Sequence, residues 1–185
     1  MATTIRELAS HLDAHGIRYK QHDDTTILTG FGGMKHYRDS GGDPHLAVVI
    51  QLLEDGEYVK VFAPSAYRIP LDDAGPVLQA CAMLQWKTKL VQFEYDASDG
   101  EVRPIVEFPL EDAPMTARQL MRCVTGLIQL VDHYHPILAK AKDEGVVAFE
   151  DADETVDLLS RLLGGFSPEI LAEALRRSDA HRRRN

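Results

Sequence analysis

The sequence predicts an α+β fold in which an antiparallel sheet carries helices packed on one face. Two observations predict the strands: segments in which apolar and polar side chains alternate, and tight turns that separate them. A third is a long segment with apolar residues every three or four positions, typical of a helix lying on a sheet. The tight turns imply antiparallel pairing, and no strand–helix crossover carries a phosphate-binding loop. The expected order is α-β-β-β-α-β-β-α, followed by a C-terminal helical extension.

The clearest part of this pattern is a hairpin and helix between residues 89 and 138. The sequence Ala97-Ser98-Asp99-Gly100 predicts the turn, because Asp and Gly tolerate left-handed backbone angles. A capping box from Thr116 to Gln119 then begins the helix. Pro136 predicts a kink or a weakened end, since it lacks the amide that would bond back to Asp132. The expected apolar positions are Val91, Phe93 and Tyr95 on the first strand, Val102, Pro104, Val106 and Phe108 on the second, and Leu120, Val124, Leu127, Val131, Tyr134 and Leu138 on the helix.

The first half of the chain contains the remaining elements. A capping box from Thr4 to Glu7 predicts a helix that stops at Gly16. Strands are expected at 17–21, 25–29, 45–53 and 58–63, and the glycine-rich stretch 30–44 is expected to be a mobile loop. A second helix, capped by Asp72 or Asp73, is expected to bury Val77, Leu78, Cys81, Leu84 and Trp86.

Composition excludes several classes of function. The 185 residues carry a net charge of −9, and five of the last ten are arginine. An acidic body repels phosphates, so neither nucleic acid nor a membrane surface is an expected partner. No apolar run approaches the roughly 20 residues of a membrane span, the N-terminus lacks the pattern of a signal peptide, and Cys81 and Cys123 fall on apolar helix faces. These features predict a protein of the reducing cytoplasm.

Several residue patterns were considered as reactive or metal-binding sites. His11 and His15 have the i, i+4 spacing of two metal ligands, but no third ligand is evident, and His133 and His135 point in different directions on a helix. The stretch 30–35 lacks the helix start that a phosphate cradle needs. The paired carboxylates at 23–24, 72–73 and 111–112 fit turns and helix starts. We therefore predict no catalytic, cofactor-binding or metal-binding residues, no cofactor and no enzymatic activity.

A second apolar face of the sheet is the candidate site. The residues Val49, Leu53, Tyr58 and Phe62 alternate with the core-facing positions of two neighbouring strands. One interpretation is that C-terminal helices or a loop of the same chain cover this face. The other is that the face supports a dimer or binds an extended segment of another protein.

The residues 46–65 (LAVVIQLLEDGEYVKVFAPS), 90–103 (LVQFEYDASDGEVR) and 131–137 (VDHYHPI) resemble the bacterial YbjN-like proteins, which are related to the type III secretion chaperone-like fold. The resemblance covers about residues 3–142. It implies a domain at 1–145, with a helical hairpin and basic tail at 146–185 outside the match. It also implies a non-enzymatic cytoplasmic module in a fold whose secretion members dimerise and hold partially unfolded proteins.

Three hypotheses about function follow. The leading one is a protein-binding, chaperone-like or regulatory module that binds a protein partner or forms a homodimer. The second is a small-molecule-binding domain or enzyme with a pocket between sheet and helices, walled by Trp86, Tyr95 and Tyr134. The third is an adaptor that the arginine tail, residues 176–185, tethers to an anionic partner.

Overall fold

The computed structural model describes residues 2–88, 90–111 and 113–149. The chain divides into two compact units, Met1–Ala148 and Phe149–Asn185. The predicted C-terminal helical hairpin and arginine tail lie outside the described residues, so the expected domain boundary at residue 145 stays a prediction.

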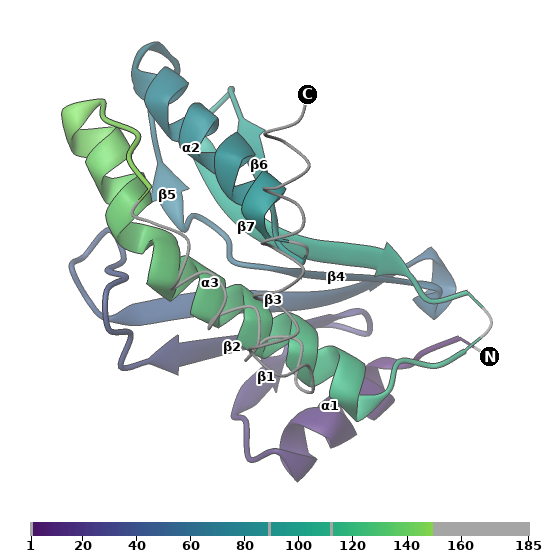
Figure 1. Ribbon diagram of the computed structural model, residues 1–185. Coiled ribbons are helices and arrows are strands. Elements are labelled where there is room, and N and C mark those ends of the chain that lie inside the picture. Colours follow the sequence, from purple (N-terminus) through teal and green to yellow (C-terminus); the bar gives the residue numbers. More distant parts are fainter. Residues whose placement is uncertain (1, 89, 112, 150–185) are drawn as a thin grey trace, which may run out of the picture. The chain divides into compact units, whose positions relative to one another are not determined.

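The described residues form an antiparallel sheet of seven strands together with three α-helices (Figure 1), which confirms the predicted α+β class. The helices are α1 (Ile5–Ala14), α2 (Ala74–Lys87) and α3 (Ala117–Glu144), and the short 3-10 turns are η1 (Glu54–Gly56) and η2 (Leu71–Asp73). The strands are β1 (Tyr19–Gln21), β2 (Thr26–Gly32), β3 (His45–Leu53), β4 (Tyr58–Phe62), β5 (Tyr67–Arg68), β6 (Gln92–Asp96) and β7 (Glu101–Pro109). None of the described helices combines the length and hydropathy that a membrane span requires.

The sheet has the order β1-β2-β3-β4-β7, and both β5 and β6 also pair with β7. Strand β4 pairs with residues 105–109 of β7, whereas β5 pairs with residues 101 and 102. Strand β6 pairs with residues 101–105 and therefore lies on the other side of β7 from both. Three distant parts of the chain thus meet on one central strand.

Both predicted capping boxes are present, at Thr4–Glu7 and at Thr116–Gln119. The stripe predicted for α3 is buried at every position. Pro136 does not end the helix, because α3 continues through it to Glu144. At the start of α2, Asp73 occupies the cap position but its side chain makes no capping hydrogen bond.

The core lies between the sheet and the helices. In Figure 1, α2 and α3 lie in front of the sheet. Alternate residues of β3 and β4 face these helices and are fully buried, including Ile50, Val59 and Val61. Complete burial of each aliphatic side chain of this size contributes about 1.5–3 kcal/mol to folding. This face of the sheet is called the covered face below.

The glycine-rich stretch differs from the mobile loop that the sequence predicts. Residues 30–32 extend β2, where they pair with residues 45–47 of β3. Further on, Tyr37 is buried, with only 2% of its surface exposed, and Asp132 of α3 holds the backbone before it. Long-range contacts that are invisible in the local sequence therefore fix the first half of this connection.

The predicted turn between β6 and β7 depends on Gly100. Its φ of +76° lies in the left-handed region, and a Cβ at this position would lie 2.6 Å from the carbonyl oxygen of Ile69. The amide of Ile69 also donates to the carbonyl oxygen of Gly100 over 2.8 Å. Only glycine fits this close backbone approach without strain.

Candidate functional site

The four residues of the predicted contact surface lie together on the face of the sheet opposite the helices. The register places Val49 directly across from Phe62, and Leu53 directly across from Tyr58. Their neighbours along both strands point to the covered face and are buried. Leu53 is 38% exposed and the other three are half-buried. We call this side of the sheet the open face.

Two apolar rows cross the open face at right angles to the strands. Directly paired residues form the first row, Leu28, Val49, Phe62 and Ile105, and the second, Leu53, Tyr58 and Pro109. A polar row of Gln51, Lys60 and Glu107 separates them. Ile105 is completely buried, so the first row ends on β7 in a side chain that is not exposed to solvent. The sequence pattern identified part of each row but not their continuation across the sheet.

Five charged side chains of β4, β6 and β7 form a continuous network beside these rows. Lys60 Nζ lies 3.5 Å from Glu107 Oε2 and 4.0 Å from Glu94 Oε1. Arg103 Nε donates to Glu94 Oε2 over 2.6 Å, and Arg103 Nη1 lies 3.9 Å from Glu101 Oε2. Each charge therefore has a partner of opposite sign within the sheet itself.

The two cations of this network also lie over the ring of Phe62. Lys60 Nζ is 5.9 Å and Arg103 Cζ 5.1 Å from the ring centroid. These distances allow cation–π attraction. Because the carboxylates hold both side chains along the sheet, the open face combines apolar surface with charges that are paired with one another.

A cavity of about 470 Å³ borders the network at the β6–β7 hairpin. It is lined by Glu94, Tyr95, Asp96, Ala97, Glu101 and Arg103. The Tyr95 hydroxyl donates to the carbonyl oxygen of Ile69 over 3.3 Å. The lining contains carboxylates and a guanidinium that are largely engaged with one another, and no nucleophile paired with a base.

This cavity differs from the pocket that the sequence analysis expects between the sheet and the helices. Tyr95 lines the cavity, but Trp86 and Tyr134 do not. Tyr134 is buried in α3, whereas Trp86 is 79% exposed on α2. The expectation that Trp86 belongs to the buried stripe of α2 is therefore wrong. It lies two positions after the buried Leu84, which turns it to the other side of the helix.

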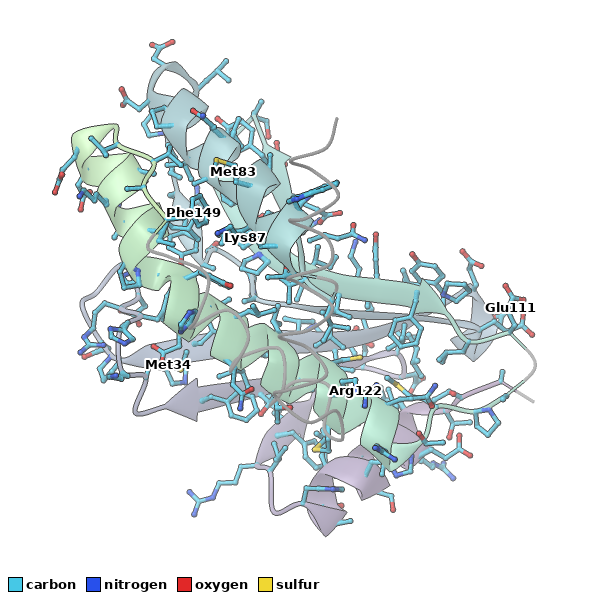
Figure 2. All side chains as sticks on the ribbon, viewed as in Figure 1. Met34, Met83, Lys87, Glu111, Arg122 and Phe149 are labelled. Carbon is cyan, nitrogen blue, oxygen red and sulfur yellow. The ribbon has the colours of Figure 1, made fainter. Side chains whose placement is uncertain are left out.

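The outer side of α2 is a surface that the sequence reasoning missed. Met83, labelled in Figure 2, is 40% exposed and shares this side with Trp86. No charged residue occurs between Ala74 and Trp86, which is unusual for an exposed helix in a chain with 26% charged residues. This absence of charge is the signal in the sequence that could have predicted the apolar outer side of α2.

The four histidines considered as ligands are held by other contacts. His11 Nε2 lies 2.9 Å from the carbonyl oxygen of Met115, and His15 Nδ1 lies 2.8 Å from that of His11. The ring of His133 packs edge-on against Tyr134, and that of His135 against Tyr37. The part of the chain that the structure describes contains no group of three potential metal-ligating side chains.

The other reactive groups considered are likewise engaged or buried. The Asp132 carboxylate accepts the backbone N–H groups of Lys35, His36 and Tyr37, so the amide of Lys35, at the end of the stretch considered as a phosphate cradle, is already bonded. Burial raises the pKa of the Cys81 thiol to about 12 and that of Cys123 to about 11. Both therefore remain protonated and unreactive at neutral pH.

Comparison with known proteins gives structural neighbours only. No family model and no curated protein sequence matches the chain. Among solved structures, YbjN from E. coli superposes with a TM-score of 0.52 at 10% identity, over 78% of this chain and 96% of YbjN. The HopA1–SchA chaperone–effector complex matches with a TM-score of 0.48 at 14% identity, over 71% of this chain and 91% of the matched chain. The ExsC–ExsE complex matches with a TM-score of 0.48 at 15% identity, over 72% and 91%.

These findings concern the fold. The chain has a fold similar to that of YbjN, as the sequence resemblance implied.

Proposed function

We propose that this chain, with its YbjN-like fold, is a non-enzymatic protein-binding module, chaperone-like or regulatory, that binds apolar segments of other proteins on its open face. The observation that carries the proposal is the pair of apolar rows on a sheet face that none of the described helices covers. Helices cover the opposite face of the same strands, and the side chains on that face form part of the core.

The composition of the open face suits binding rather than folding. Aromatic side chains such as Phe62 and Tyr58 provide large contact areas and are enriched in protein interfaces. The charges beside them are paired within the sheet, two cations with three carboxylates, so a partner contacts the apolar rows without having to pair with every charge of the network. Binding driven by apolar burial tolerates variation in the sequence of the partner, as a chaperone-like role requires.

The cavity at the β6–β7 hairpin supports the second hypothesis, a small-molecule site. Its lining brings Glu94, Glu101 and Arg103 together within one pocket. A ligand bound through Arg103 would first have to displace Glu94, whose oxygen accepts its Nε–H over 2.6 Å. The internal pairing of these groups favours a structural role for them, and we therefore rank protein binding first.

An aggregation assay tests the proposal. A chemically unfolded model protein is diluted from denaturant into buffer, and its light scattering is followed with and without this chain. We expect the parent chain to suppress aggregation at roughly equimolar ratio, and Tyr58→Ser/Phe62→Ser to lose most of that suppression. The double variant removes aromatic area from both apolar rows while leaving the covered face intact.

Tyr19→Ser is the matched control, because Tyr19 is a half-buried tyrosine on β1 that lies outside both rows. It should suppress aggregation as the parent does, and circular dichroism should confirm that both variants are folded. Absence of suppression by the parent, or equal suppression by the double variant, would contradict the proposal. Light scattering of the purified 20.6 kDa chain then shows whether a second copy is the occupant of the open face, since the measured mass would double.

A further inference from the structure

The connection between β2 and β3 is fastened to α3 by one side chain. We call residues 33–44 the strap; Met34 near its beginning is labelled in Figure 2. The carboxylate of Asp132 accepts the backbone N–H of Lys35 over 3.0 Å, of His36 over 2.7 Å and of Tyr37 over 2.8 Å. Three consecutive amides bound to one carboxylate form a strong, charge-assisted anchor.

Aromatic packing provides the second anchor of the strap. Tyr37 is buried, and its ring meets Tyr67 edge-on at 5.9 Å and His135 edge-on at 5.3 Å between centroids. Its hydroxyl donates to the carbonyl oxygen of Ala66 over 3.0 Å. The His135 ring stacks on Tyr67 at 5.8 Å, and its Nδ1 lies 3.3 Å from the Tyr67 hydroxyl. His135 therefore connects α3, β5 and the strap.

Burial and the charged groups around His135 set the cost of giving it a proton. On α3 it faces Asp132, which favours the proton, and Lys142, which opposes it. On the strap it faces the guanidinium of Arg38, which opposes the proton, and the imidazole of His36. Arg38 is held close because its Nη1 donates to the carbonyl oxygens of Met34 and Tyr37. Burial, with the charges of Arg38 and Lys142, lowers the pKa of His135 and keeps the imidazole neutral while the strap is attached.

We propose that the strap is a pH-sensitive device in which protonation of His135 releases residues 33–38 from α3. The released strap exposes the apolar side chains of Met34 and Tyr37, which are buried while it is attached. Release requires no titration of the two neighbouring phenols. Burial raises the pKa of both neighbouring phenols, that of Tyr37 to about 12, so their hydroxyls stay protonated.

The direction of the effect follows from linkage between protonation and release. In the released state His135 is solvated and recovers an ordinary pKa near 6.5, so this state binds the proton first. Attachment is therefore strongest above about pH 6.5 and weakens as the pH falls toward the lower pKa of the attached state. Asp132 stays ionised throughout this window. Burial opposes its ionisation, but the three amide donors outweigh burial and leave its pKa below the usual 3.8.

Amide hydrogen exchange on the intact chain tests the proposal. Protection of the amides of Lys35, His36 and Tyr37, corrected for the intrinsic effect of pH, should fall on the order of threefold between about pH 7.5 and 5.5. The amides of Ile50 and Val61 in the central strands should keep their protection, which separates local release from global unfolding.

Two substitutions of His135 make the test decisive. His135→Phe keeps a ring between the tyrosines without a titratable nitrogen, and His135→Gln removes the charge with a smaller polar group. Both should abolish the pH dependence at residues 35–37, whereas His133→Gln, two positions away on α3, should retain it. Asp132→Asn should lower the protection of these amides at every pH, on the order of tenfold. An unchanged pH dependence in the His135 variants, or none in the parent chain, would overturn the proposal.

Discussion

The two faces of the sheet are built from the same strands but have opposite composition. On β3 and β4, the residues facing the helices are aliphatic and fully buried, as Ile50 and Val61 illustrate. The residues between them, such as Val49, Lys60 and Phe62, are half-buried and mix apolar rings with paired charges. The covered face therefore carries the stability of the fold, and the open face is the surface for which we propose contact with a partner. Substitutions on the two faces should separate these properties.

The largest loss of stability is expected from a substitution on the covered face. Ile50→Ala leaves a cavity in a completely buried site and should cost about 2–5 kcal/mol of unfolding free energy. Its neighbour Val49 lies on the open face, and Val49→Ala should cost less than about 1 kcal/mol. Urea unfolding followed by circular dichroism measures both. Equal losses at the two positions would show that both faces are equally packed.

The next effect concerns the hairpin that carries Glu94 and Arg103 to the open face. Gly100→Ala places a methyl group against the carbonyl of Ile69 at a positive φ, and should cost about 2 kcal/mol or more. Gly75→Ala on α2 is the control, because nothing lies within 4 Å of the added methyl group. It should stabilise the protein by up to about 1 kcal/mol. Thermal unfolding of the two variants should therefore shift in opposite directions.

Asp132, which anchors the strap on the helix side of the sheet, should make the free energy of unfolding depend on pH in the acidic range. Because the folded pKa of Asp132 is below its usual 3.8, its contribution to stability is complete above that pH and is lost as the pH falls through the folded pKa. Urea unfolding at a series of acidic pH values gives the free energy of unfolding as a function of pH. The slope of this free energy against pH should be smaller for Asp132→Asn than for the parent chain. Identical slopes would mean that the carboxylate contributes nothing to folding.

The smallest effect is expected in the charge network. Lys60 and Glu107 are partly exposed, and pairs of this kind typically contribute less than about 1 kcal/mol. A double-mutant cycle with Lys60→Met and Glu107→Gln should therefore give a small coupling that shrinks further in concentrated salt. A coupling free energy well above this range would show that the network contributes substantially to the stability of the fold.

The sequence predicted the elements and the candidate surface where the information is local. The two-residue period of the strands expected at 45–53 and 58–63 was enough to place Val49, Leu53, Tyr58 and Phe62 on one face. Capping boxes at Thr4 and Thr116 located two helix starts. These signals depend only on neighbouring residues, which is why they were reliable.

Features that depend on register between distant strands could not be predicted. The link from Lys60 to Glu94 requires β4 and β6 to pair with the same strand, and no local pattern encodes this. The position of Ile105 between Phe62 and Gln92 depends on the same two pairings. The anchoring of the strap by Asp132, almost a hundred residues away along the chain, was hidden for the same reason. The position of Trp86, in contrast, was available from helical geometry and was misjudged.

Methyl-detected NMR of this chain, titrated with an unfolded model protein, locates the surface to which the unfolded protein binds. Methyl groups of Leu28, Val49 and Leu53 report on the open face, and those of Ile50, Leu52 and Val61 report on the covered face. On titration, the account predicts shifts or broadening of the open-face methyl signals while the covered-face signals stay unchanged. Binding that leaves the open-face signals unchanged and perturbs other regions, or no binding at all, would contradict the assignment of this face as the protein-binding surface.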